Sequence, residues 1–184
     1  MSLQLTIAPL IDHLRVHALR TDGPFRLRSG VVSNWYLDAR QTTYSGVGAR
    51  LVGAAVLDAL LPGVEAVGGM TMGADPIALA TVITASEHGR DLRAFSIRKE
   101  TKSHGVGGRL VGPVGPGDQA AVLDDTVTTG GALFEALDAL AAAGVQVVQA
   151  VALVDRSNGV VAREAQQRGV PYSALVSPAD LGVE

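Results

Sequence analysis

Apolar runs and polar stretches alternate along the whole chain. Short apolar runs bounded by glycine or polar residues indicate buried strands, and apolar positions at a spacing of three and four indicate helices. We therefore expect strands at residues 25–28, 34–38, 64–68, 94–97, 120–124, 145–154 and 170–176. Helices are expected at residues 5–20, 46–61, from 75 onward, 131–143 and 159–168. Asp75-Pro76 reads as an N-cap followed by a first-turn proline, and Gly144 as a C-cap.

This alternation of strands and helices predicts an α/β fold. Strands that alternate with helices form a mostly parallel sheet flanked by helices. In such sheets ligands bind beyond the carboxyl ends of the strands. The length of 184 residues fits a single domain over residues 1–184, and there is no repeat or low-complexity tract.

Composition narrows the function classes. The net charge of −3 argues against a general nucleic-acid or membrane surface, and the 47% hydrophobic content argues against disorder. The absence of cysteine excludes disulfides and thiolate metal sites. No apolar stretch is long enough to cross a bilayer, and the first residues lack a signal-peptide pattern. A cytoplasmic enzyme is the expectation.

The segment from Ala120 to Leu133 carries the most chemical information. An apolar strand ends in Asp124 and Asp125, and a small-residue turn leads into a helix. Hydroxyls and backbone N–H groups at a helix N-terminus favour a phosphate, whereas the two carboxylates can accept hydrogen bonds from vicinal ribose hydroxyls. The alternatives are a solvated strand-turn-helix corner and a nucleotide triphosphatase. The latter needs a G-x-x-x-x-G-K-[ST] loop, which this chain lacks.

This segment resembles the phosphoribosyl pyrophosphate (PRPP) motif of the type I phosphoribosyltransferases. The resemblance implies the fold of that family, with a small hood built from about residues 1–40 and 171–184 around a core of about 41–170. It implies that PRPP is held by the two acids and the loop, at Asp124, Asp125, Thr126, Val127, Thr128, Thr129, Gly130, Gly131 and Ala132.

The only two lysines, Lys99 and Lys102, lie in one glycine-rich segment that starts at Arg98. A flexible ammonium differs physically from the guanidinium that the chain uses elsewhere. With His104, the segment offers four potential cations on what reads as a mobile loop that could close over a polyanion. The alternative is an ordinary solvated charged loop.

The stretch Arg98-Lys99-Glu100-Thr101-Lys102-Ser103-His104-Gly105 also resembles the catalytic loop of orotate phosphoribosyltransferases. The resemblance implies that Arg98, Lys99, Lys102 and His104 bind PRPP and act in catalysis. It leaves open whether Lys102 or His104 is a proton donor.

Three further positions have two readings each. The glycine-rich turn at residues 68–76 stands where the family has its pyrophosphate loop, but it carries no lysine, and it could be a simple tight turn. Asp155-Arg156 is either a structural ion pair or a ligand contact; in the family, the arginine binds the orotate carboxylate. Trp35 and Tyr36 are either core residues or, by resemblance, rings beside the pyrimidine.

The resemblance implies that orotate receives the phosphoribosyl group of PRPP, with Thr128, Arg156, Arg28 and Tyr36 as its binding residues. Mg²⁺ is the expected cofactor, carried mainly by PRPP, with Asp124 and Asp125 as candidate ligands. A homodimer that shares loop residues between subunits is also implied. The alternatives are a phosphoribosyltransferase for another base and a non-catalytic regulator that senses PRPP.

Overall fold

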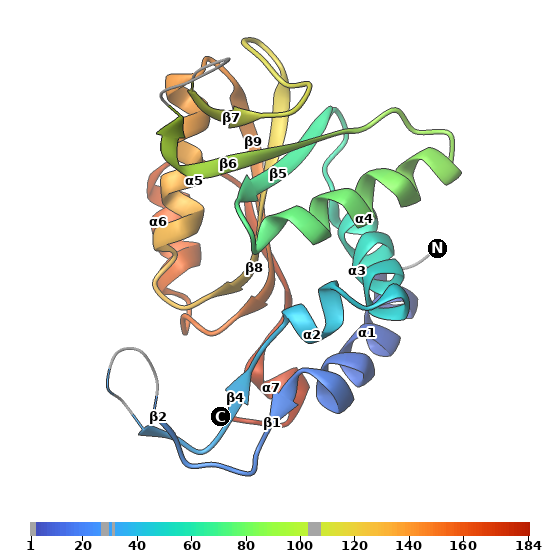
Figure 1. Ribbon diagram of the computed structural model, residues 1–184, viewed down its shortest axis with the longest axis vertical. Coiled ribbons are helices and arrows are strands. Elements are labelled where there is room, and N and C mark those ends of the chain that lie inside the picture. Colours follow the sequence, from blue (N-terminus) through green and yellow to red (C-terminus); the bar gives the residue numbers. More distant parts are fainter. Residues whose placement is uncertain (1–2, 27–29, 31, 103–107) are drawn as a thin grey trace.

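The computed structural model describes residues 3–26, 30, 32–102 and 108–184. Its centre is a six-stranded sheet in the order β10-β9-β8-β5-β6-β7 (Figure 1). All neighbouring strands are parallel except the edge pair β6 and β7, which is antiparallel. The prediction of an α/β fold with a mostly parallel sheet is confirmed.

The described residues form ten strands and seven helices. The central sheet consists of β5 (Ala66–Met70), β6 (Arg93–Lys102), β7 (Gly108–Val111), β8 (Gln119–Val127), β9 (Gln146–Asp155) and β10 (Tyr172–Val176). The helices are α1 (Leu3–His17), α2 (Arg40–Thr43), α3 (Gly46–Ala59), α4 (Ala74–Glu87), α5 (Gly131–Ala142), α6 (Val160–Gln167) and α7 (Pro178–Leu181). Two short antiparallel pairs complete the fold: β1 (Leu19–Arg20) with β4 (Tyr36–Leu37), and β2 (Phe25–Arg26) with β3 (Val32–Ser33).

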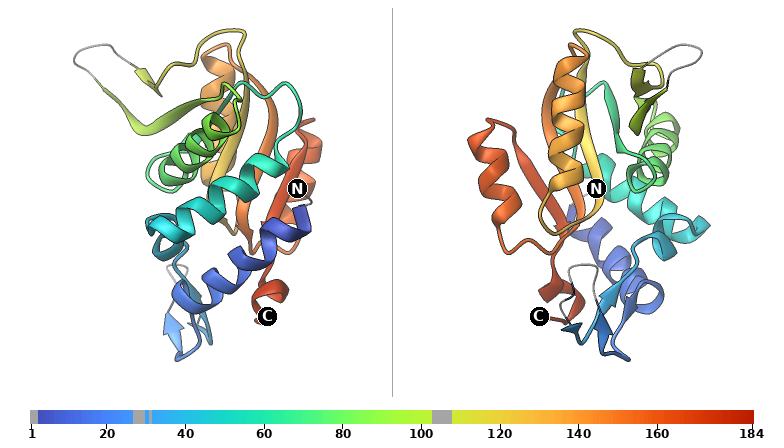
Figure 2. Two further views of the ribbon diagram at one scale, coloured as in Figure 1. Left: turned by 90° about the vertical axis from the view of Figure 1, so that its right-hand side faces the viewer. Right: turned by 60° about the vertical axis from the view of Figure 1, so that its left-hand side comes forward.

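Helices cover both faces of the sheet, so its central strands β5, β8 and β9 are largely buried on both sides. In Figure 2, α1, α3 and α4 lie on one face and α5 and α6 on the other. Successive side chains of a strand point to opposite faces. Accordingly, Ala121 and Leu123 of β8 belong to the core under α3 and α4, whereas Ala120 and Val122 belong to the core under α5 and α6.

The small elements below the sheet in Figure 1 are strands β1 to β4 and helix α7, and we refer to them as the hood. Arg15 of α1 donates to the carbonyl of Asp180 at 2.5 Å, and Nε1 of Trp35 donates to the carbonyl of Glu184 at 2.7 Å. Strand β10, which the expected hood included, instead pairs with β9 in the central sheet.

Two local predictions are wrong. Residues 98–102 continue strand β6 instead of forming a loop, and β7 pairs with them as an unpredicted edge strand. Asp75 is not the N-cap of α4, because the helix already begins at Ala74 after Gly73. The Asp75 carboxylate instead accepts hydrogen bonds from two hydroxyl groups of other segments.

Among the helices of the described residues, none has the length and apolar character needed to cross a membrane.

Candidate active site

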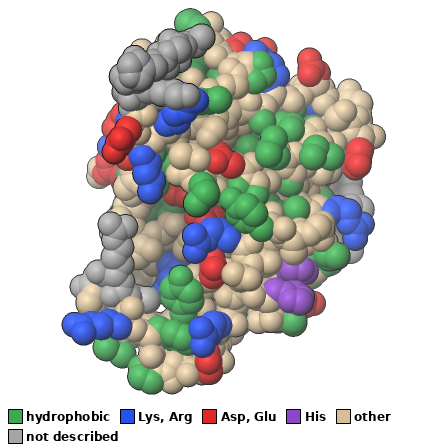
Figure 3. All heavy atoms as spheres, in the orientation of Figure 1, with side chains coloured by type: hydrophobic (Ala, Val, Ile, Leu, Met, Phe, Trp, Pro, Cys, Tyr) green, Lys and Arg blue, Asp and Glu red, His purple; other side chains and the backbone are tan. Residues whose placement is uncertain are grey.

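A cavity of about 700 Å³ opens between the carboxyl ends of the central strands and the hood. In Figure 3 it corresponds to the hollow between the upper body of the molecule and the segments below. Four segments line it, namely residues 36–40, 70–73, 99–100 and 124–126, together with Ala132 and Glu135 of α5. Its position beyond the strand ends is the one expected for a ligand site in a parallel α/β sheet.

Asp124 and Asp125 lie inside the last part of β8, which runs to Val127, and both line the cavity. The Asp124 carboxylate accepts a hydrogen bond from the backbone N–H of Asp125 at 3.1 Å. The Asp125 carboxylate accepts one from the backbone N–H of Thr126 at 2.8 Å. These bonds fix both side chains and leave carboxylate oxygens free to accept hydroxyl groups of a ligand.

Burial raises the pKa of both carboxyl groups. Asp124 is only 8% exposed, and its burial, together with the neighbouring Asp125 charge, raises its pKa to about 7. Burial also raises the pKa of Asp125, which the backbone N–H of Thr126 and the Arg40 charge counteract. Near neutral pH, Asp124 therefore carries a proton part of the time and can either donate or accept a hydrogen bond.

The turn between β5 and α4 forms a second wall of the cavity through Met70, Thr71, Met72 and Gly73. A Cβ on Gly73 would lie 2.9 Å from Oδ1 of Asp125, so glycine lets the turn approach that carboxylate closely. The backbone N–H of Thr71 donates to the carbonyl of Ile97 at 2.9 Å. This hydrogen bond places the turn next to strand β6.

The predicted phosphate loop leads from β8 into α5. Thr128 and Thr129 are exposed, and Gly130 is the N-cap of α5, with a φ of 77° that favours glycine. No side chain caps this helix, so its first N–H groups are available to an anion. Of the predicted loop residues, Thr126 and Ala132 line the cavity, whereas the Val127 side chain is buried in the core.

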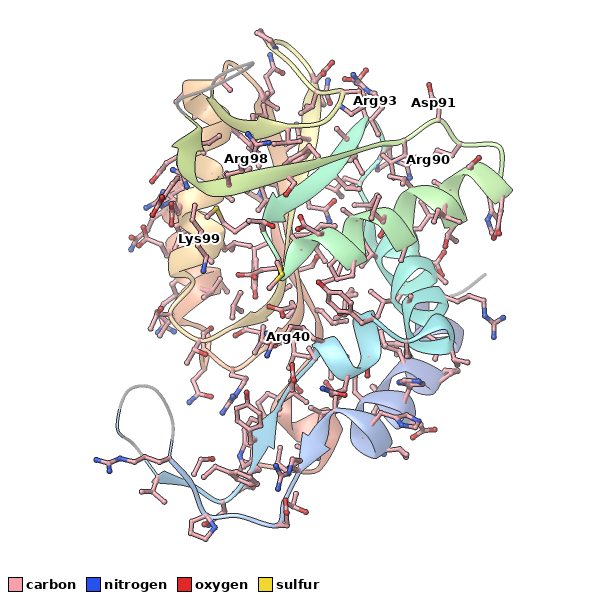
Figure 4. The ribbon with its side chains drawn as sticks, viewed as in Figure 1. Arg40, Arg90, Asp91, Arg93, Arg98 and Lys99 are labelled. Atoms are coloured by element: carbon pink, nitrogen blue, oxygen red, sulfur yellow. The ribbon has the colours of Figure 1, made fainter. Side chains whose placement is uncertain are left out.

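Strand β6 brings Lys99 to the cavity (Figure 4), while Arg98 is not among its lining residues. The carbonyl of Arg98 accepts a hydrogen bond from Nε of Arg109, and Arg109 also forms an ion pair with Glu135. These contacts join the β6–β7 edge to α5. His104 and the side chain of Lys102 lie outside the described part of the structure.

The predicted orotate-binding residues come from the hood and from the end of β9. Tyr36 is 37% exposed and lines the cavity. Trp35 is buried, and the guanidinium of Arg156 lies over its ring at 3.9 Å. Arg156 is partly buried, and desolvation lowers its pKa. Arg28 lies outside the described residues.

Asp155 and Arg156 do not form an ion pair with each other. The Asp155 carboxylate accepts hydrogen bonds from the backbone N–H of Ser157 at 2.6 Å and from the hydroxyl of Tyr172 at 2.9 Å. The Arg156 guanidinium makes no hydrogen bond or ion pair with any residue that the structure describes. Its charge is thus held on an aromatic ring, and Arg156 is not among the residues that line the cavity.

Four charged residues at the cavity were not predicted as site residues, namely Asp38, Arg40, Glu100 and Glu135. Arg40 of α2 lies at its edge (Figure 4) and is paired with Asp38 at 2.8 Å. Glu135 of α5 completes the lining. The Asp-Ala-Arg sequence at 38–40 reads as an exposed polar turn, and only the position of the hood over the sheet brings it to the site.

The described residues contain no group of three or more side chains suited to hold a metal ion. Asp124 and Asp125 are the paired carboxylates of the cavity. Such a pair fits Mg²⁺, which keeps several waters and is usually shared with substrate phosphates.

No protein-family model matches the chain. The orotate phosphoribosyltransferase of Rhodopirellula baltica is 39% identical over 185 residues, which cover 97% of this chain and 95% of that protein. The Streptomyces avermitilis orotate phosphoribosyltransferase is 40% identical over 163 residues, covering 88% of this chain and 90% of that protein.

Solved structures agree with these relatives. The Mycobacterium tuberculosis orotate phosphoribosyltransferase in complex with Fe(III) dicitrate superposes with a TM-score of 0.84 at 32% identity, over 97% of this chain and 99% of that one. The same enzyme in complex with PRPP gives a TM-score of 0.78 at 30% identity, with the same coverage. The adenine phosphoribosyltransferase of Leishmania donovani, at 16% identity and a TM-score of 0.63, covers 93% of this chain and 80% of that one and shares the fold.

The covered, mostly parallel sheet, with two acids at the end of β8 and a glycine-capped helix after them, has the fold of the phosphoribosyltransferases. Within that class, the chain belongs to the orotate phosphoribosyltransferase family.

Proposed function

We infer that the protein transfers the 5-phosphoribosyl group from PRPP to orotate, giving orotidine 5′-phosphate and pyrophosphate in de novo pyrimidine biosynthesis. The observation that carries this inference is a single cavity lined by Asp124, Asp125 and Lys99, in a chain of this family. The two carboxylates of this cavity can accept hydrogen bonds from ribose hydroxyls, and the Lys99 ammonium can bind a phosphate of the same ligand.

In this proposal the ribose 5-phosphate and the pyrophosphate of PRPP are bound by different segments of the protein. Asp124 and Asp125 accept hydrogen bonds from the ribose hydroxyls, and the loop at residues 126–132 binds the 5-phosphate at the N-terminus of α5. We assign the pyrophosphate contacts to Lys99, Lys102, Arg98 and His104 on the basis of the family resemblance. Lys99 is the member of this set that lines the cavity.

Orotate binds between the hood and the end of β9. Arg156 pairs with its carboxylate through the guanidinium fork, because planar bidentate pairing suits a carboxylate. The ring of Tyr36 lies beside the flat pyrimidine, and Thr128 and Arg28 complete the orotate contacts. The stack of Arg156 on Trp35, at 3.9 Å, supports this role because it orients the guanidinium before orotate arrives.

The reaction requires no covalent intermediate with the protein. The bond between C1 of the ribose and the pyrophosphate oxygen breaks, and its electron pair stays on the pyrophosphate. N1 of orotate forms the new bond to C1 and loses its proton, which the leaving pyrophosphate takes up. Positive charge develops on the ribose ring and negative charge on the pyrophosphate. Cations placed at the pyrophosphate stabilise that charge most strongly in the transition state.

Three further features belong to this proposal. Mg²⁺ enters with PRPP and neutralises phosphate charge, and Asp124 and Asp125 are its nearest candidate ligands. The enzyme acts in the cytoplasm as a homodimer in which the segment around Lys102 serves the partner's site. The chain forms one domain, with the hood closing the substrate side.

An absorbance assay tests the proposal. Purified protein is mixed with PRPP and Mg²⁺ and with orotate, uracil, adenine or hypoxanthine in separate reactions. We expect only orotate to be consumed, with equimolar pyrophosphate formed. Consumption of another base would identify a different phosphoribosyltransferase. PRPP binding without consumption of any base would favour a regulator.

A further inference from the structure

The carboxylate of Asp75 joins two segments that lie far apart in the sequence. Its Oδ2 accepts a hydrogen bond from Oγ1 of Thr71 at 2.6 Å, and its Oδ1 accepts one from Oγ of Ser96, also at 2.6 Å. Thr71 belongs to the turn between β5 and α4, and Ser96 belongs to strand β6. The Asp75 side chain, in the first turn of helix α4, therefore links the β5–α4 turn to strand β6.

This bridge sits directly behind the candidate active site. Thr71 lines the main cavity, whereas Asp75 and Ser96 do not. Ser96 precedes Lys99 by three residues in the same strand, and Lys99 also lines the cavity. Asp75 thus fixes the position of the turn relative to a cation of the site without itself facing the substrate.

The composition of the turn makes its position important. Residues 68–74 contain no lysine, arginine or histidine. A long cationic side chain can adjust to a phosphate, but backbone N–H groups bind only over a short range of distances and angles. A turn that contacts pyrophosphate through its backbone must therefore be held in place before the ligand arrives.

The two hydrogen bonds occupy both carboxylate oxygens of Asp75. Both carboxylate oxygens accept short hydrogen bonds from hydroxyl groups, and hydrogen bonds to an ionised acceptor are stronger than those between neutral groups. The bridge is therefore stiff, and both oxygens face their donors.

We propose that Asp75 is a positioning residue for phosphoribosyl transfer, holding the Thr71-Met72-Gly73 turn against β6 so that its backbone can bind the pyrophosphate of PRPP. This inference rests on the proposed function. It concerns a residue that acts through the turn and not through contact with the substrate.

The test is a comparison of four Michaelis constants in wild type and Asp75→Ala. Initial rates in the forward direction give the KM for PRPP and for orotate, and the reverse direction gives the KM for pyrophosphate and for orotidine 5′-phosphate. We expect the KM for PRPP and for pyrophosphate to rise about tenfold, as the loss of two hydrogen bonds predicts. The constants for orotate and its nucleotide should change less than about twofold.

Two variants at the bridge separate positioning from a general loss of structure. Asp75→Asn keeps both contacts, because the amide oxygen can accept from one hydroxyl and the amide nitrogen can donate to the other. It should restore both phosphate constants to within about threefold of wild type. Ser96→Ala removes one arm of the bridge and should give an intermediate rise.

Asp118→Ala is the matched control at the opposite end of the sheet. The Asp118 carboxylate accepts two hydrogen bonds from Arg93, at 2.9 and 3.0 Å, and one from the backbone N–H of Gly115 at 2.8 Å. Arg93 begins β6 and Asp118 precedes β8, so this pair lies at the amino ends of the strands. The control should lower the melting temperature and leave all four constants unchanged.

The proposal is overturned if Asp75→Ala leaves the KM for PRPP and pyrophosphate unchanged, or raises all four constants equally. If that variant does not fold, Ser96→Ala decides on the same criterion. Calorimetric titration of the apoprotein with Mg²⁺-pyrophosphate provides a readout without turnover. If wild type consumes no orotate but binds pyrophosphate more tightly than Asp75→Ala does, the proposed function fails and the positioning role stands.

Discussion

The buried carboxyl group of Asp124 lies beside that of Asp125. This arrangement lowers the stability of the protein without ligand. A carboxyl group whose pKa rises from 3.8 to about 7 on folding is ionised in the unfolded chain over a range where the folded protein keeps its proton. The free energy of unfolding therefore falls as the pH rises through this range, and the whole decrease is reached above pH 7. The same environment makes the group a strong acceptor once a ribose hydroxyl is in place.

We expect Asp124→Asn to stabilise the protein without ligand at pH 8 by a few kcal/mol, on the order of the shift of Asp124 converted at about 1.4 kcal/mol per unit. The gain should shrink at pH 5, because folded Asp124 is then protonated and costs less. Urea unfolding at the two pH values measures it. An equal gain at both pH values would contradict a titrating Asp124.

Arg156 gives the second prediction at this scale. Arg156→Ala should raise the KM for orotate at least about thirtyfold, because the substrate carboxylate loses a partly desolvated partner. The KM for PRPP should stay nearly constant. Arg163→Ala, which removes an exposed arginine of α6, is the control. Unchanged orotate kinetics in Arg156→Ala would place the carboxylate partner elsewhere.

Secondary-structure elements could be predicted from sequence where their signal is local. The apolar run of β8 and the start of α5 at Gly131 agree with the pattern. Strand β6 does not end with its apolar part at Ile97, because pairing with β7 continues it through charged residues that need no burial at the sheet edge. Helix α7 begins with a capping box formed by Ser177 and Asp180. This signal is local, but the helix was not predicted.

The candidate site could be predicted only where its residues have a local sequence signal. Asp124 and Asp125 follow from one continuous motif, and Lys99 from its unusual residue type. Arg40 was not predictable, since its place at the cavity depends on how the hood packs over the sheet. Asp75 was wrongly predicted as an N-cap, because Asp-Pro fits a helix start, whereas its carboxylate accepts a hydrogen bond from Ser96 of β6.

The packing of α3 on α4 gives a prediction that opposes helix propensity. A Cβ on Gly53 of α3 would lie 2.5 Å from the carbonyl oxygen of Ala80 in α4. Gly53→Ala should therefore destabilise the protein by about 1–3 kcal/mol, although alanine is the better helix former by about 1 kcal/mol. Denaturant unfolding measures the change. Gly46→Ala, at a position of the same helix with open space, should shift stability by less than about 0.5 kcal/mol.

At the scale of the whole molecule, the proposed sharing of loops between subunits can be tested by complementation. A Lys102→Ala chain keeps Asp124 and Asp125 but has a defective segment around Lys102, and an Asp124→Ala-Asp125→Ala chain has the opposite defect. Each homodimer should be inactive, since loss of one transition-state stabilising group costs about 10²–10³ in kcat. Subunit exchange should restore up to about a quarter of wild-type activity, because half the dimers become hybrids with one complete site.

Native mass spectrometry provides the control for this experiment by confirming that hybrids form. Hybrids without activity would mean that each loop serves its own subunit. The shared site would then be wrong, while the reaction itself would be unaffected.

The hydrogen bond from Trp35 to the carbonyl of Glu184 has a consequence for the order of events during synthesis. The two residues are 149 positions apart, which a ribosome adding about 5–20 residues per second covers in roughly 7 to 30 s. Throughout that interval the indole that supports Arg156 lacks its partner. The sheet can assemble as the chain emerges, but this contact on the orotate side of the cavity forms only after residue 184 has been translated. A nascent chain arrested before residue 178 should therefore acquire its PRPP side before its orotate side.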